Sequence, residues 1–387
     1  MAMRRPTTRL GSRPVSWTAV GVLVGMAACK QPSANLAPDR CAWSFVRYEP
    51  SSWETEWREG ELSGERTDRE CEVLATPSEI DRTVRLIRHN QDLMSRSKAI
   101  PPDSIGLYSR MVYAERCGPG QQPTGRQRVQ LIEPLIGILR DPLTICPRPQ
   151  GGPFDVYYSF SADESQEQSK RHLLIASAAP WSDTPSDANS WHLGGLEPSA
   201  LDANTRRRSR ARQNILMDIG ASTYNGRNGD AGHVGARWFV DRYKRHNLAF
   251  DWIVSFESDK YDPDTLFQTV PPDVLPHYIY YNQGVDKSPN GKWNPWRILI
   301  GMGATRDDYV VIKLDIDPQE IENSLIAQLA EDPNLLSIID EMFYEHRVNS
   351  KPMWPYWHTE GSPIILADTY RIFSALRSKG VRMHSWP

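Results

Sequence analysis

The chain has 387 residues, of which 39% are hydrophobic and 10% aromatic, and this composition excludes a disordered chain and supports a packed core. The formal net charge of −3 argues against a nucleic-acid-binding protein that works through a global basic field, so we expect no nucleic-acid partner. The length allows two domains, or one domain with a long N-terminal extension.

Residues 1–30 resemble a targeting segment. Four arginines precede an apolar run that extends from Val15 to Cys29: Arg4, Arg5, Arg9 and Arg13. A basic stretch followed by such a run predicts a secretory signal peptide. The run is short for a spanning helix, which needs about twenty apolar residues, but a signal anchor remains an alternative. We therefore predict a lumenal protein of the secretory pathway, located in the Golgi or secreted. Its signal peptide is either removed by cleavage or kept as a single N-terminal membrane anchor.

Two other interpretations of this segment stay open. It resembles a bacterial lipoprotein signal loosely, through Met26-Ala27-Ala28-Cys29, although the first position of that motif is usually Leu. It also resembles a disordered N-terminus with an apolar stretch that arose by chance.

The cysteines support the secretory interpretation. Beyond Cys29, four cysteines lie in one region and none follows them: Cys41, Cys71, Cys117 and Cys146. Four cysteines in a lumenal protein predict two disulfides, and the spacing leaves all three connectivities open. A zinc site is disfavoured, because no CxxC pair occurs.

Residues 31–150 are interpreted as a disulfide-stapled, loop-rich extension. The sequence Thr76-Pro77-Ser78-Glu79 is typical of a helix start, and the apolar spacing after it predicts a helix over 77–96. Turn signals dominate the remainder of this region, including Pro101-Pro102 and Gly118-Pro119-Gly120.

Residues 151–212 form a bridge to the C-terminal half. Strands are predicted at 155–160 and 172–176, and a basic run follows at 206–212. This run is typical of a solvated linker. A patch for an anionic substrate and a dibasic processing site are the alternatives.

Residues 213–387 alternate between strand and helix patterns, which predicts an α/β doubly wound, mostly parallel sheet. The predicted strands, in chain order, are 214–219, 250–256, 277–282, 309–314, 338–344 and 381–385. The predicted helices are 236–246, 319–330 and 364–376.

Acidic residues follow the predicted strands, where ligands bind in open α/β sheets. Asp218-Ile219-Gly220-Ala221 ends the first strand, and Glu257 ends the second. The fourth strand runs into Lys313-Leu314-Asp315-Ile316-Asp317-Pro318-Gln319-Glu320, and the fifth into Glu345-His346. Each motif alone is a weak signal, since a strand-ending acid can equally cap a turn or a helix.

Taken in order, these motifs resemble the FkbM-type S-adenosylmethionine-dependent methyltransferase family. The resemblance covers about 214–350, and its most specific part is the Lys-x-Asp-x-acid-x-x-Glu element. Asp317 and Pro318 stand where the family has Glu and Gly, and an insertion from Tyr224 to Gly235 replaces a compact turn. The resemblance implies a Rossmann-like methyltransferase fold.

The resemblance also implies roles for individual residues. The S-adenosylmethionine site would contain Asp218, Gly220, Ala221, Glu257 and Asp286. Asp315 and Glu320 would line the substrate side, and the catalytic candidates are His346, Asp317 and Lys313. A divalent cation held by Asp317 and Glu345 would be a further cofactor, because it would lower the pKa of the acceptor.

The expected activity is methyl transfer to a hydroxyl oxygen of a sugar or glycan, with a small-molecule or glycan substrate as the partner. Two alternatives remain: a catalytically inactive methyltransferase-like binding module, and a lumenal glycosyltransferase that uses Asp315 and Asp317. A nicotinamide oxidoreductase is disfavoured, because Gly220-Ala221-Ser222 does not supply the G-x-G-x-x-G turn.

Overall fold

The computed structural model describes residues 41–95, 102–117, 122–139, 146, 182–183, 212–226, 235–244 and 247–386. The predicted targeting segment, the strands at 155–160 and 172–176, and the basic run up to residue 211 lie outside these residues. Among the helices that the structure describes, none is both long enough and apolar enough to cross a membrane.

The C-terminal half is built on a six-stranded sheet whose neighbouring strands are all parallel. Its strands are β5 (Asn214–Ile219), β6 (Trp252–Phe256), β7 (Tyr278–Tyr281), β8 (Tyr309–Leu314), β9 (Glu341–Tyr344) and β10 (Arg382–Ser385). Their spatial order is β10-β9-β8-β5-β6-β7. The chain therefore builds outward from β5 in one direction and then from β8 in the other. This reversal places a topological switch point between β5 and β8.

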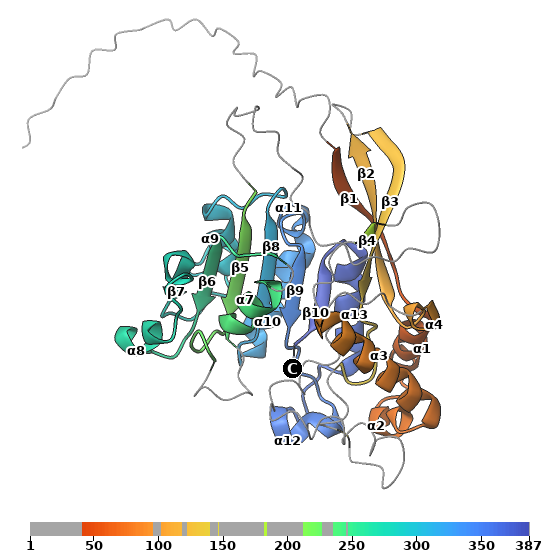
Figure 1. Ribbon diagram of the computed structural model, residues 1–387. Coiled ribbons are helices and arrows are strands. Elements are labelled where there is room, and N and C mark those ends of the chain that lie inside the picture. The colour runs from red at the N-terminus through yellow and green to blue at the C-terminus, as the bar shows by residue number, and fades with distance from the viewer. Residues whose placement is uncertain are drawn as a thin grey trace, which may run out of the picture.

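Helices cover both faces of this sheet (Figure 1). One face packs on α7 (Ala236–Lys244) and α8 (Pro263–Gln268), and the other on α9 (Pro295–Gly301), α10 (Gln319–Glu331) and α13 (Leu366–Ser378). The two faces are distinguished by the alternating side chains of β5: Leu216 belongs to one hydrophobic cluster, and its neighbours Ile215 and Met217 belong to the other. The prediction of a doubly wound, mostly parallel sheet is confirmed at this level.

Strands covered on both faces become continuously apolar, and this explains why they were visible in the sequence. Every residue of β8 is buried, including Lys313. The predicted strand at 250–256 begins only at Trp252, and that at 277–282 begins at Tyr278 after the short 3-10 helix η3 (Leu275–His277).

The predicted strand at 338–344 is shorter than expected, because β9 begins at Glu341 after a turn.

Three short helices that the sequence analysis did not identify begin with a shared Asx-Pro signal: α8 after Asp262, α9 after Asn294 and α11 (Pro333–Leu336) after Asp332. In each, the side chain of the preceding Asp or Asn accepts a backbone hydrogen bond from the first turn, and proline occupies the first helical position.

The prediction that the N-terminal region is loop-rich is wrong. It contains three strands of an antiparallel sheet, β1 (Cys41–Glu49), β2 (Ser109–Cys117) and β3 (Gln122–Ile132), and the bridge adds the fourth, β4 (Ser182–Asp183). Its helices are α1 (Ser52–Leu62), α2 (Glu70–Leu74), α3 (Pro77–Ser95) and α4 (Pro102–Ile105). The first six residues of β3 are exposed, so this part of the strand carries no alternating apolar signal. The helix predicted over 77–96 is confirmed as α3.

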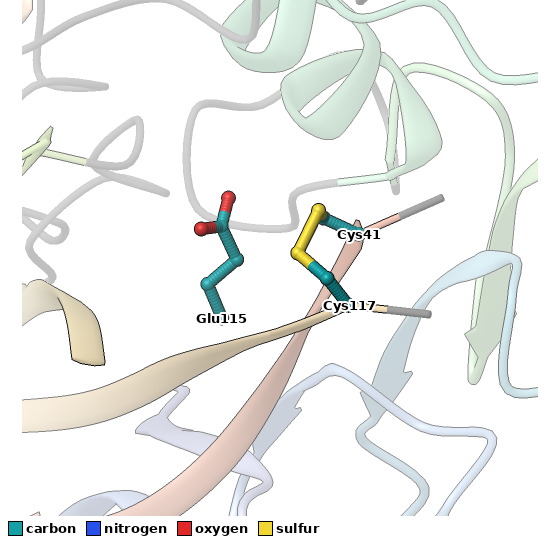
Figure 2. Close-up of side chains that lie close together, drawn as sticks. All are labelled: Cys41, Glu115 and Cys117. Carbon is teal, nitrogen blue, oxygen red and sulfur yellow. A yellow bond between two sulfur atoms is a disulfide. The ribbon is translucent and has the colours of Figure 1, made fainter. Parts of the chain in front are cut away.

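Both predicted disulfides are present in this region. Cys41 pairs with Cys117 and ties the ends of β1 and β2 together (Figure 2), while Cys71 in α2 pairs with Cys146. The structure thereby selects one of the three connectivities that the sequence left open.

A buried ion network joins the N-terminal region to the C-terminal half, and α13 lies between the two sheets (Figure 1). Arg377 of α13 has no exposed side-chain surface and contacts Glu54 of α1 at 3.2 Å and Glu133 after β3 at 3.2 Å. His384 of β10 lies between Glu133 and Glu341, with one ring nitrogen 2.7 Å from each carboxylate. A single hydrophobic cluster contains side chains from both halves, including Trp53 and Phe373.

We expect thiol counting on denatured, unreduced protein to find none of the four paired cysteines free. Peptide mapping should recover the pairs Cys41–Cys117 and Cys71–Cys146. Replacing both Cys71 and Cys146 by Ala should lower the free energy of unfolding by about 2–4 kcal/mol, because the loop they close gains freedom in the unfolded chain. Two or more free thiols, or a different pairing, would contradict this arrangement.

We expect Arg377→Ala to lower the free energy of unfolding by about 3–5 kcal/mol, because it leaves two buried carboxylates without their cation. Arg371→Ala is the matched control on the same helix, since its ion pair with Asp368 leaves the Arg371 side chain 55% exposed. The control should change stability by less than about 1 kcal/mol. Urea denaturation measures the free energy of unfolding of both variants. An equal loss in the two variants would contradict a stabilising role for the buried ion network around Arg377.

Candidate functional site

The candidate site lies at the carboxyl ends of β5 and β8, at the topological switch point. Asp218 and Lys313 are register partners on these neighbouring strands. The Lys313 ammonium lies 3.2 Å from Asp218 Oδ1 and 3.4 Å from Asp315 Oδ2, and it donates to the Gly220 carbonyl oxygen at 2.6 Å. One buried lysine therefore holds the loops that follow both strands.

The charges of this cluster do not balance. Burial opposes the charged form of Lys313, but the carboxylates of Asp218 and Asp315 outweigh this effect and raise its pKa. Burial also raises the pKa of Asp218, although the Lys313 charge opposes this shift. Neither carboxylate oxygen of Asp218 accepts a hydrogen bond of standard geometry from the described residues. Asp218 is thus a buried acid with acceptor capacity to spare.

Gly220 is required by the protein's own packing. Its φ of +89° lies in the left-handed region, and a Cβ built on it would lie 1.7 Å from the Asp315 carbonyl oxygen. Its amide and that of Ala221, which is buried, both donate to the Phe256 carbonyl oxygen at 3.0 Å. The turn after β5 is therefore pressed between the loops that follow β8 and β6.

Glu257, directly after β6, organises the same turn. Its carboxylate accepts hydrogen bonds from the Ser222 amide at 2.8 Å and the Asp259 amide at 3.0 Å. Tyr280 of β7 donates its hydroxyl to the Ser222 carbonyl oxygen at 2.5 Å. Glu257 is only partly buried. Its Oε1 also accepts a hydrogen bond from the Ser258 hydroxyl at 3.2 Å, so Oε2, which accepts only the Ser222 amide, is the oxygen that keeps a lone pair for a further donor.

Asp286 lies in the loop after β7 and stabilises that loop. Its carboxylate accepts a hydrogen bond from the Trp293 amide at 2.8 Å, and its own amide donates to the Trp293 carbonyl oxygen at 3.2 Å. A Cβ on Gly291 would lie 2.4 Å from the Asp286 side chain. Its predicted contact with adenine stays a prediction.

The predicted substrate-side acids differ in their surroundings. Asp315 accepts a hydrogen bond from Trp386 Nε1 at 3.2 Å as well as its contact with Lys313. Asp317 is 85% exposed and pairs with Arg347. Glu320 is 73% exposed and pairs with Lys287 at 3.2 Å.

The proposed metal ligands Asp317 and Glu345 are bridged by Arg347. The guanidinium donates to Asp317, and its Nε lies 3.1 Å from Glu345 Oε2. Glu345 also accepts a hydrogen bond from Trp357 Nε1, in the short helix α12 (Trp354–Trp357), at 3.1 Å. Arg347 thus lies between these two carboxylates and supplies the positive charge that the hypothesis of a metal site assigns to a divalent cation.

Within the described ranges, one group of three His, Cys, Asp or Glu side chains brings a ligand atom of each close enough to the others to hold a metal ion: Cys41, Glu115 and Cys117 (Figure 2). Both sulfurs are consumed by the disulfide, so this group has no thiolate to offer. The prediction that Asp317 and Glu345 bind a metal remains untested.

His346 is 6% exposed and faces α13, where its Nδ1 lies 2.8 Å from the Thr369 hydroxyl oxygen. Burial lowers the pKa of His346 to about 4, with a small opposing effect from Asp368. The imidazole is therefore neutral across physiological pH, which a general base requires. The value differs from the ordinary histidine value of about 6.5 that the sequence alone would suggest.

Several residues around the site were missed by the sequence analysis: Ser222, Tyr280, Glu322, Arg347 and Trp386. Tyr280, Arg347 and Trp386 lie outside the motifs that carried the resemblance, and Glu320, two residues before Glu322, was the glutamate assigned to the substrate side. Trp386 is the penultimate residue, and only the fold brings it to Asp315.

No protein-family model, curated protein or solved structure matches this chain. The geometry of the site therefore carries the functional argument alone.

The residues at the switch point fit S-adenosylmethionine in part. Asp218 offers carboxylate oxygens without standard hydrogen bonds, and Glu257 is a partly exposed acceptor on the neighbouring strand. The two acids lie on adjacent strands, because Ile219 and Phe256 are register partners. Residues 227–234 of the insertion lie outside the described residues.

We expect Gly220→Ala to destabilise the protein by more than about 2 kcal/mol, because backbone atoms rather than a flexible side chain oppose the added Cβ. The control is Gly301→Ala at the end of α9, where a Cβ meets nothing within 4 Å. Thermal unfolding compares the two. If Gly220→Ala is as stable as the control, the packing between the loops after β5 and β8 is wrong.

Proposed function

We propose that the C-terminal half is an S-adenosylmethionine-dependent methyltransferase with a Rossmann-like methyltransferase fold of the FkbM type. The observation that carries this proposal is the pair of acids, Asp218 and Glu257, that end the adjacent strands β5 and β6 at the switch point. An acid after the second strand of a doubly wound sheet is suited to accept hydrogen bonds from ribose hydroxyls. Buried Asp218 would complement a cationic group.

The cofactor supplies a methyl group already activated on a sulfonium, so the protein's task is mainly positioning. Glu257 would bind the ribose, while Asp286 would lie near the adenine. Lys313 would keep the turn at Gly220 and the carboxylates of Asp218 and Asp315 in a fixed arrangement. Its role is thus to position other groups.

The acceptor class follows from the predicted compartment and the resemblance: a hydroxyl oxygen of a sugar or glycan. During methyl transfer this oxygen forms a bond to carbon, and its proton must pass to a base. Neutral His346 and the exposed Asp317 are the candidates, with Asp315 and Glu320 on the substrate side.

The glycosyltransferase alternative requires Asp315 and Asp317 to hold a metal together. Contacts within the protein disfavour this, because Asp315 is held by Lys313 and Trp386, whereas Asp317 pairs with Arg347. An inactive binding module remains the second candidate, since the buried Asp218 and the partly buried Glu257 also suit binding without turnover. Calorimetry with S-adenosylmethionine and with a nucleotide sugar distinguishes a methyltransferase from a glycosyltransferase by the ligand that binds. A protein that binds S-adenosylmethionine without turning it over is the inactive binding module.

We expect Glu257→Ala to weaken S-adenosylmethionine binding by about 1.5–3 kcal/mol, the usual contribution of hydrogen bonds to a charged group. Because Glu257 also holds the Ser222 amide, thermal unfolding of the variant should be measured beside calorimetry. Glu331→Ala, an exposed glutamate of α10, is the control and should bind as the unaltered protein does. Unchanged affinity in the Glu257 variant would remove the ribose assignment.

If His346 is the base, the rate should rise through a pKa of about 4 and stay level between pH 6 and 8, because the neutral form is already populated there. His346→Ala should then lower the rate by about 10²–10⁴-fold while cofactor binding persists. The same assay with a chelator tests the metal hypothesis, since loss of turnover and its recovery with Mg²⁺ would favour Asp317 and Glu345. Full activity of the variant, insensitive to chelator, would reject both roles.

A further inference from the structure

A second glutamate of α10, Glu322, contacts the loop that follows β8, whereas Glu320 pairs with Lys287. Glu322 has no exposed surface, and its Oε1 accepts a hydrogen bond from the Ile316 amide at 2.9 Å. Ile316 stands between Asp315 and Asp317, the two acids expected on the substrate side. The Glu322 side chain therefore holds the centre of the loop that carries both of them.

The local sequence explains why a side chain from inside the helix is needed there. Pro318 occupies the N-cap position of α10 and offers no side-chain acceptor. The Asp315 amide is bonded to the Ile219 carbonyl oxygen at 2.9 Å, which leaves the Ile316 amide as the next donor of the loop. Glu322 reaches back over one helical turn to accept it.

The surroundings of Glu322 favour a neutral carboxylic acid. Its Oε2 is buried and has no hydrogen-bond partner among the described residues, and an ionised oxygen in that position would be costly. The facing groups are Asp315 after β8, Tyr344 in β9, and Glu345 and Arg347 after β9. Arg347 already pairs with Asp317 and Glu345, so the local charge is acidic.

We propose that Glu322 is a positioning residue for the substrate-side loop, and that it holds Asp315 and Asp317 in place as a protonated carboxyl group. The substrate-side role of the loop rests on the proposed function, whereas the contact with Ile316 and the protonation do not. Burial raises the pKa of Glu322 to about 9, with Glu345 and Asp315 adding to the effect and the Ile316 amide opposing it.

Protonation of Glu322 predicts the direction in which the stability of the protein changes with pH. A carboxyl group whose pKa is raised by folding binds its proton more tightly in the folded state, so its contribution to stability falls as pH rises from the unfolded value of about 4.3. The fall continues up to the folded value of about 9. Glu322→Gln, which mimics the neutral acid and cannot titrate, should lose this dependence.

The first experiment measures thermal unfolding of Glu322→Gln and the unaltered full chain at several pH values between 5 and 9. We expect the melting temperature of the Gln variant, relative to the unaltered protein, to increase steadily with pH. Glu331→Gln, at the exposed end of the same helix, should show a constant difference. A constant difference for Glu322→Gln as well would overturn the protonation.

The second experiment measures hydrogen exchange of the peptide that contains Ile316 in the same proteins and in Glu322→Ala. We expect the Ala variant to lose protection in this peptide and the Gln variant to keep it, because Gln retains a carbonyl acceptor. Equal protection in all of them would overturn the positioning role. Should the Ala variant fail to fold, the Gln variant still decides, since protection lost in a folded Gln variant contradicts the proposal.

S-adenosylmethionine binding then separates this inference from the proposed function. If none of the proteins binds S-adenosylmethionine while the pH and exchange results hold, the proposed function fails and the role of Glu322 in the loop stands. If binding occurs and the exchange results fail, the reverse holds.

Discussion

The arrangement of the candidate site depends on one buried ammonium group. Lys313 lies on β8 opposite Asp218 on β5, and its contacts reach both loops at the point where the sheet reverses its winding. A buried lysine is tolerated only when carboxylates and carbonyl oxygens replace its hydration, and here two carboxylates and one carbonyl oxygen do so. Because the same carbonyl belongs to Gly220, the lysine fixes the turn on which any ligand of this edge would rest.

A second buried network joins the C-terminal half to the N-terminal region. Arg377 lies in α13 and His384 in β10, the last helix and the last strand of the chain, yet their partners Glu54 and Glu133 come from the N-terminal region. Ion pairs of this kind contribute little net stability but are costly to break, so they fix how the parts fit together. The N-terminal region, with its disulfides, is therefore a structural component of the sheet's edge.

The acids at the carboxyl edge divide according to burial. Asp317 and Glu320 are exposed and paired with cations, so they can exchange partners at small cost. Asp218 and Glu322 are fully buried, and burial raises the pKa of both. Their protonation states are consequently set by the fold, and this makes them sensitive to any ligand or loop movement that changes their solvation.

The sequence by itself determined the C-terminal sheet, because strands covered on both faces are continuously apolar and end in recognisable acids, as at Asp218 and Glu257. It also determined the helix at Pro77 and the presence of two disulfides. Only the tertiary structure decided which cysteines pair, that the N-terminal region contains strands of a sheet, and that the buried Glu322 accepts a hydrogen bond from the Ile316 amide. These features depend on contacts between distant segments and on which side chain is buried, and neither is encoded in the local pattern of apolar and polar residues.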